Sequence, residues 1–133
     1  MGKTFRLLVI NPGSTSTKIA VFFNERQLFE KVLRHPAEEI NKYKTIYDQF
    51  DFRKKVILDT LYENGMKPED FDVVVARGGN MKPVQGGTYR INEQMIKDLR
   101  QGVMGHHASN LAGLIAYEIA NRLGFPPMWW IRS

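Results

Sequence analysis

The chain has 133 residues, a length typical of one folded domain with a single hydrophobic core. Its 43% hydrophobic and 25% charged residues exclude the class of disordered chains that are poor in apolar residues and rich in charge. The lack of cysteine excludes a disulfide scaffold and a thiolate zinc site, and no apolar run reaches the ~20 residues of a membrane span. The net charge of +5 and the pI of about 9.6 suit an anionic ligand, although the basic residues are dispersed.

The first part of the chain predicts three short strands in a meander. Runs rich in Val, Ile, Leu and Phe occupy 6–10, 18–23 and 27–34, and Pro-Gly-Ser and Asn-Glu-Arg turn signals separate them. The first run is too short for the apolar core of a signal peptide, so it predicts a buried strand. We therefore expect a cytoplasmic protein with no membrane partner.

Helical spacing begins after Pro36. Apolar residues then recur at helical spacing as far as Gly65, which is a typical helix terminator: first Ile40, Tyr43, Ile46 or Tyr47, and Phe50, then Val56, Ile57, Leu61 and Tyr62. The pattern predicts two helices or one broken helix. The densest basic cluster, Arg53 with the two lysines after it, lies at the start of the second helical pattern and predicts a solvated helix face.

The second half predicts alternating strands and helices. Residues 72–76 form a continuous apolar run, typical of a strand buried on both faces, and residues 84–91 surround two glycines, which favours a hairpin. Asn92 is a good cap for a short helix. A longer helix is expected over 109–123, and the tail from Pro126, PPMWWIRS, begins like another strand.

The segment from Asn11 to Lys18, NPGSTSTK, lies between two predicted strands. A turn with glycine and several small hydroxyl residues allows backbone amides and hydroxyl groups to converge on phosphate oxygens, and Lys18 would add a positive charge. It is not a Walker A loop, because Thr17 stands where that motif needs glycine. On chemistry alone, an ordinary polar hairpin turn with Asn11 as its capping side chain stays open.

Arg77 follows the predicted strand 72–76 and precedes Gly78 and Gly79, where the backbone can approach a ligand closely. A guanidinium binds carboxylates and phosphates through two parallel hydrogen bonds, so Arg77 is a candidate for both substrate and phosphoryl binding. The alternative is an ordinary arginine at a strand end. An apolar pocket wall is expected just after it, at Met81, Pro83 and Val84.

His106 and His107 lie just before the predicted helix 109–123. An imidazole there can hydrogen-bond phosphoryl oxygens, and the helix amino terminus adds a favourable dipole. His107 is the preferred candidate, and a capping or solvent-exposed pair is the alternative. A zinc site is not expected, since no other ligands cluster nearby in the sequence.

Four segments together resemble the acetate and butyrate kinases, members of the actin-like ATPase group. In chain order they are NPGSTSTK at 11–18, VVVARGG at 73–79, PVQGGTYRIN at 83–92 and GHHASNLAGLIAYEIA at 105–120. The last three are similar to butyrate kinases rather than acetate kinases. The resemblance extends to about Pro127 and implies an α/β fold, the ribonuclease-H-like amino-terminal domain of an actin-like ATPase, with a three-stranded meander, further strands and flanking helices.

The resemblance implies that the first segment binds the cofactor, ATP with Mg²⁺. The residues carried over to cofactor binding are Asn11, Gly13, Ser14, Ser16 and Lys18. Asn11 and Ser16 are also implied to act on the metal indirectly, through the magnesium-nucleotide complex.

The resemblance also implies catalytic roles for Arg77, His107 and His106, and a substrate-binding role for Arg77 with Gly78 and Gly79. In acetate kinases the strand motif reads HRVVHGG, so Arg77 stands where those enzymes have histidine.

The activity implied is ATP-dependent phosphorylation of butyrate or a related short-chain carboxylate to the acyl phosphate, and the reverse, by a homo-oligomer. Full-length relatives are longer, so we expect residues 1–133 to be a single amino-terminal domain without the carboxyl-terminal nucleotide domain, inactive alone. One alternative is a non-catalytic anion-binding or oligomerising module on a degenerate kinase fold. A nucleic-acid-binding domain is the other; it is not expected, because clustered carboxylates and an aromatic-basic stripe are lacking.

Overall fold

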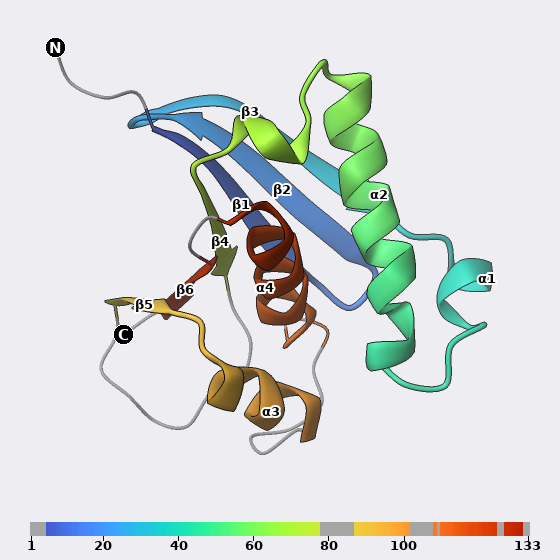
Figure 1. Ribbon diagram of the computed structural model, residues 1–133. Coiled ribbons are helices and arrows are strands. Elements are labelled where there is room, and N and C mark those ends of the chain that lie inside the picture. Colours follow the sequence, from blue (N-terminus) through green and yellow to red (C-terminus); the bar gives the residue numbers. More distant parts are fainter. Residues whose placement is uncertain (1–4, 78–86, 102–107, 109, 125–126, 132–133) are drawn as a thin grey trace, which may run out of the picture.

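The computed structural model describes residues 5–77, 87–101, 108, 110–124 and 127–131. These residues form an α/β structure, which Figure 1 shows as a twisted sheet with helices packed against it. The elements in chain order are β1 (Arg6–Pro12), β2 (Ser16–Phe23), β3 (Arg26–Arg34), α1 (Ala37–Ile40), η1 (Tyr47–Gln49), α2 (Phe50–Glu63), η2 (Pro68–Asp70), β4 (Val73–Arg77), β5 (Gly87–Arg90), α3 (Glu93–Gln101), α4 (Asn110–Leu123) and β6 (Pro127–Ile131).

The described strands form one six-stranded sheet in the order β3-β2-β1-β4-β6-β5. β1, β2 and β3 make an antiparallel meander, and β4 then lies parallel to β1. Asn11 is opposite Lys18, and Ile10 is beside Ala76. Because successive side chains alternate between the faces of a sheet, this register brings Asn11, Lys18 and Arg77 out on the same face.

The helices α2 and α4 cover the other face (Figure 1). Every second residue of β1, β2 and β4 points into this layer, as the period-two pattern of a half-buried strand requires. The core that results is contributed mainly by Leu8, Ile10, Ile19, Val21, Ile57, Leu61, Val74, Ala76, Leu111 and Ile115.

Local signals in the sequence fix the helix ends. α2 ends in a Schellman motif: Gly65 has φ 75°, its N–H donates to the carbonyl of Tyr62, and the N–H of Met66 donates to that of Leu61. At the start of α3, the Asn92 side chain accepts a hydrogen bond from the N–H of Met95 at 2.9 Å. These ends agree with the sequence predictions.

Two predictions need correction, and a third falls partly outside the described residues. The first helical segment is only the short α1, and residues 41–46 are not helical, because tight turns at Lys42 and Tyr43 end it. β4 is not buried on both faces, since Val73 and Val75 remain partly exposed on the face without helices. Of the expected hairpin over 84–91, residues 84–86 lie outside the described part, and β5 pairs with the distant β6.

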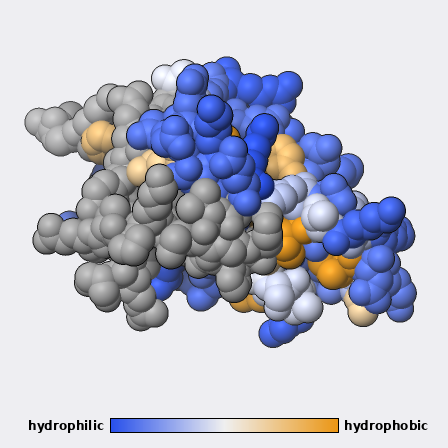
Figure 2. Space-filling model, turned by 90° about the horizontal axis from the view of Figure 1, so that it is seen from below, coloured by the Kyte–Doolittle hydropathy of each residue, from blue (hydrophilic) through white to orange (hydrophobic). Residues whose placement is uncertain are grey.

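The surface seen in Figure 2 is mainly hydrophilic where it is described, with apolar residues in small separate patches. Within the described ranges, no helix combines the length and the apolarity that crossing a bilayer requires.

Candidate functional site

The turn between β1 and β2 lies at the centre of the predicted phosphate segment. The N–H of Gly13 donates to the carbonyl of Ser16 at 2.7 Å, which closes the turn. A Cβ added to Gly13 would lie 3.3 Å from the Ser16 Oγ, so a larger residue would press on this hydroxyl. Ser14 and Thr15, at the tip, are exposed. The turn is therefore compact and open to a ligand at its tip.

The sequence prediction for Arg53 is wrong. Its side chain is fully buried, at 0% exposure, because α2 turns it toward the sheet and under the turn. Nη1 donates to the carbonyl oxygens of Gly13 at 2.6 Å and Ser16 at 2.9 Å, and Nη2 donates to that of Ser14 at 3.0 Å. Gln49, one helical turn earlier, accepts from Nε and Nη2 through its Oε1. Arg53 is thus a clamp on the backbone of the turn.

The two lysines after Arg53 differ from each other as well. Lys54 pairs with Glu118 of α4 at 2.8 Å, and its side chain is only 19% exposed. Lys55 is 75% exposed and pairs with Asp59 on the same helix. Of the predicted solvated cluster, only Lys55 has the expected environment.

His35 supports the turn from a second side. It is 7% exposed, its backbone N–H donates to the carbonyl of Thr15 at 2.8 Å, and its Nε2 lies 2.7 Å from the Thr17 Oγ1. Arg53 Nη1 also donates to that hydroxyl, at 3.3 Å, so Thr17 connects the guanidinium to the imidazole. Burial, and secondly the charge of Arg53, lower the pKa of His35.

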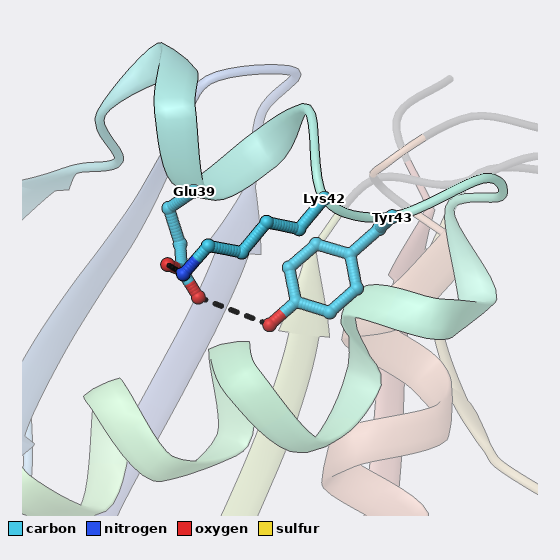
Figure 3. Close-up of polar contacts among 3 residues, drawn as sticks. All are labelled: Glu39, Lys42 and Tyr43. Atoms are coloured by element: carbon cyan, nitrogen blue, oxygen red, sulfur yellow. Dashed lines mark hydrogen bonds and ion pairs between the residues drawn. The ribbon is translucent and has the colours of Figure 1, made fainter.

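Aromatic contacts connect His35 to the segment after β3. The His35 ring packs edge-on against Phe52, at 5.0 Å between centroids, and Tyr43 stacks on the Phe52 ring at 5.9 Å. Figure 3 shows the hydroxyl of Tyr43 donating to Glu39, which also pairs with Lys42 at 2.8 Å. The hydrogen bond from Lys42 lowers the pKa of Glu39. This chain of contacts fixes the imidazole under the turn.

These contacts determine the direction of the peptide groups in the turn. The carbonyls of residues 13, 14 and 16 point to Arg53, and that of residue 15 points to His35. In a planar trans peptide the N–H points opposite to the C=O, so the N–H groups of Ser14 and Thr15, which share peptides with the carbonyls of Gly13 and Ser14, are directed away from Arg53. Successive outward N–H groups form the kind of concavity that binds anions.

A cavity of about 290 Å³ lies on the face of the sheet that α2 and α4 leave uncovered, because its lining residues alternate along the strands with those that face the helices. Three of the predicted site residues, Asn11, Lys18 and Arg77, line it together. The rest of its lining is largely apolar and consists of Val9, Ala20, Phe22 and Val75, with Gln27 and Glu30. Lys18 forms an ion pair with Glu30 at 3.2 Å, with both side chains 39% exposed. The cavity thus joins cationic and amide groups to an apolar floor.

The structure gives a position to six of the predicted site residues. Asn11, Lys18 and Arg77 meet in the cavity, and the turn residues Gly13, Ser14 and Ser16 lie at the end of the same strand pair. Gly78, Gly79, His106 and His107 lie outside the described residues, as do Met81, Pro83 and Val84, which were expected as a pocket wall.

Sequence reasoning missed Arg53 and His35. A signal for Arg53 was present, because it precedes Ile57 and Leu61 by four and eight positions, on the buried stripe of α2. The run of three cations concealed this periodicity. His35, between a strand and Pro36, carried no comparable signal.

The groups present suit a phosphate ester with its magnesium. Outward N–H groups, the Ser14 and Ser16 hydroxyls and the Lys18 ammonium are donors for phosphate oxygens. The oxygens of Asn11 and Ser16 are of the hard type that Mg²⁺ prefers, and Mg²⁺ keeps most of its waters, so few protein ligands are needed. Within the described ranges there is no group of three or more His, Asp or Glu side chains placed to hold a metal ion.

The chain is similar in sequence to known kinases. No protein-family model matches the chain. It is 57% identical over 122 residues to butyrate kinase 1 of Clostridium acetobutylicum. This match covers 92% of this chain and 34% of that protein. Probable butyrate kinases of two Clostridium botulinum strains are 56% identical over 123 residues, covering 92% of this chain and 35% of each relative. The chain thus spans about a third of the length of these curated relatives.

Solved structures agree on the fold. An exopolyphosphatase from Cytophaga hutchinsonii matches with a TM-score of 0.59 and 9% identity, covering 98% of this chain and 55% of its own. The acetate kinase of Porphyromonas gingivalis matches with a TM-score of 0.56 and 19% identity, covering 95% and 37%, respectively. A propionate kinase from Francisella tularensis matches with a TM-score of 0.52 and 15% identity, covering 95% of this chain and 36% of its own. The fold is that of the actin-like ATPases, and by sequence the chain belongs to the butyrate kinase family.

Proposed function

We propose that this chain provides the carboxylate- and phosphoryl-binding side of an ATP-dependent butyrate kinase. The observation that carries the proposal is the cavity in which Asn11, Lys18 and Arg77 lie above an apolar floor, beside the turn clamped by Arg53. A short-chain carboxylate has one charged end and one aliphatic end, and this cavity offers a partner to each. Adenosine binding is proposed to come from sequence that the relatives have and this chain does not span, and residues 1–133 are proposed to form one domain.

These residues are needed mainly to stabilise negative charge. A short-chain carboxylate, with a pKa like that of a Glu side chain at ~4.3, is ionised at neutral pH and needs no general base. Two anions must be held in line while charge redistributes on the phosphoryl oxygens. The fork of Arg77 suits a carboxylate or a phosphoryl group, and its contacts would strengthen in the transition state.

The remaining groups have positioning roles in this proposal. The outward N–H groups of the turn and the hydroxyls of Ser14 and Ser16 bind phosphate oxygens, and Asn11 with Ser16 orients the metal. When bound, ATP supplies the phosphoryl group and Mg²⁺ offsets its charge. Val9, Ala20 and Val75 exclude water from the aliphatic tail. Roles for His106 and His107, a homo-oligomeric state and a cytoplasmic location rest on the family resemblance alone.

The test is a chimera in which this chain replaces the matching segment of the Clostridium acetobutylicum relative. Acyl phosphate formed from butyrate and ATP is trapped as hydroxamate. We expect activity in the chimera, little or none in the 133-residue chain alone, and a raised KM for ATP in a Ser16→Ala chimera. A chimera that folds but forms no acyl phosphate would contradict the proposal. The second candidate, an anion-binding module without catalysis, would then be favoured, since the clamped turn needs no reaction to bind an anion.

A further inference from the structure

The guanidinium of Arg53 is a buried charge whose hydrogen-bond partners are all neutral. They are three backbone carbonyls, the Thr17 hydroxyl and the Gln49 amide oxygen. All 14 acidic residues of the chain fall within the described ranges, and none of them forms an ion pair with Arg53. A buried charge without a counter-charge is costly, because carbonyl dipoles replace only part of its hydration.

The counter-charge has an obvious place on the other side of the turn. The carbonyls of Gly13 and Ser14 point to the inner side of the turn. The N–H groups of the same two peptides, which belong to Ser14 and Thr15, therefore face outward at the exposed tip. An anion bound to those N–H groups would be separated from Arg53 only by the backbone of the turn. It would gain from the N–H dipoles and from the buried cation together.

We propose that Arg53 is a positioning residue that makes the Gly13–Ser16 turn an anion site, with a phosphate group of the ligand as its missing counter-charge. The inference rests on the proposed function in that it assigns phosphate groups to this turn. It extends that function, because it assigns the affinity of the turn to a residue 37 to 40 positions away that binds the inner, carbonyl side of the turn. Burial lowers the pKa of Arg53 to about 10, so the clamp remains charged at neutral pH.

The direct test uses the 133-residue chain and inorganic pyrophosphate, by calorimetric titration and by the pyrophosphate-induced rise in Tm. In Arg53→Lys, which keeps the charge but loses the fork, we expect affinity to fall about ten-fold, and in Arg53→Gln about a hundred-fold. Gln49→Met, which keeps the cation but removes an acceptor that orients it, should give a smaller loss. Lys55→Gln, an equal change of charge on the exposed face of the same helix, should be nearly neutral.

The shift in Tm with ligand separates this role from a structural one. A clamp that only stabilises the fold would lower the Tm of the variants but leave the pyrophosphate-induced rise unchanged, and that result would overturn the proposal. The proposal would also be overturned if millimolar pyrophosphate does not bind the wild-type chain. If Arg53→Gln does not fold, Arg53→Lys and Gln49→Met decide the question. Pyrophosphate affinity equal to that of the wild type in both of these folded variants would contradict the proposal.

The chimera distinguishes this inference from the proposed function. We expect Arg53→Lys to raise the KM for ATP about ten-fold and to leave the KM for butyrate unchanged. If the chimera is inactive but binds pyrophosphate in a way that depends on Arg53, the inference is supported and the kinase assignment is contradicted. An active chimera that is indifferent to Arg53→Lys would remove the inference alone.

Discussion

The Nη1 atom of Arg53 lies 2.6 Å from the carbonyl oxygen of Gly13, which is 40 residues earlier in the chain. This contact ties α2 to the turn between β1 and β2. It makes the shape of the turn depend on a residue outside the phosphate motif.

Loss of the clamp should destabilise the fold. Arg53→Met leaves the carbonyls of Gly13 and Ser14 without their inner donor, and we expect the free energy of unfolding to fall by about 3 kcal/mol, as buried acceptors lose their partners. Urea denaturation measures this. The matched variant Lys55→Met, on the exposed face of α2, should stay within about 0.5 kcal/mol of the wild type. Equal effects of the two changes would contradict the buried position of Arg53.

His35 should make stability depend on pH. Its folded pKa is below the ordinary value of 6.5, so its contribution is complete above about pH 6.5 and is lost as the pH falls toward the folded pKa, where the buried imidazole must be protonated. The difference in unfolding free energy between wild type and His35→Gln should therefore shrink on acidification from pH 7.5 to about 5. Chemical denaturation across this range tests it, and a difference that stays constant with pH would disprove it.

Much of the fold was accessible from sequence because its signals are local. The meander, α2, α4 and the stops at Gly65 and Gly124 follow from periodicity and from glycine with positive φ. Asn11, Lys18 and Arg77 were identified from the residues and motif resemblance, but not their common cavity, which depends on strand register.

The clamp was not accessible in the same way. The acceptors of Arg53 are carbonyl oxygens, which every residue has, so no residue type marks them as partners. Only the position of Arg53 on the buried stripe with Ile57 and Leu61 indicated that its charge is inside.

The ion pair between Lys18 and Glu30 should restrain anion binding in the cavity. Glu30→Gln removes the internal competitor for the Lys18 ammonium, and we expect affinity of the 133-residue chain for butyrate to rise about three-fold, a small change because the pair is partly exposed. NMR titration measures it. Glu25→Gln, at the exposed turn between β2 and β3, is the control for net charge. The same gain in both variants would mean that the ion pair is not the cause.

The apolar floor should select the length of the carboxylate. Ala20→Leu narrows the cavity between β1 and β3, and in the chimera we expect the KM for butyrate to rise about ten-fold and that for acetate to rise less. Val73→Leu, on β4 and on the same face but outside the lining, should change neither value. A parallel rise for both substrates in Ala20→Leu would indicate that the tail binds elsewhere.

The most direct test of the account is the turnover number of the chimera after Arg77→Ala, measured by hydroxamate trapping at saturating ATP and butyrate. If Arg77 contacts the reacting groups, kcat should fall about a hundred-fold or more, and Arg77→Lys should recover little of it, because an ammonium cannot reproduce the guanidinium fork. Arg26→Ala, on the exposed start of β3, should retain normal turnover. A near-normal kcat and KM for butyrate in Arg77→Ala would contradict the account, since Arg77 would then be a structural residue at the end of β4.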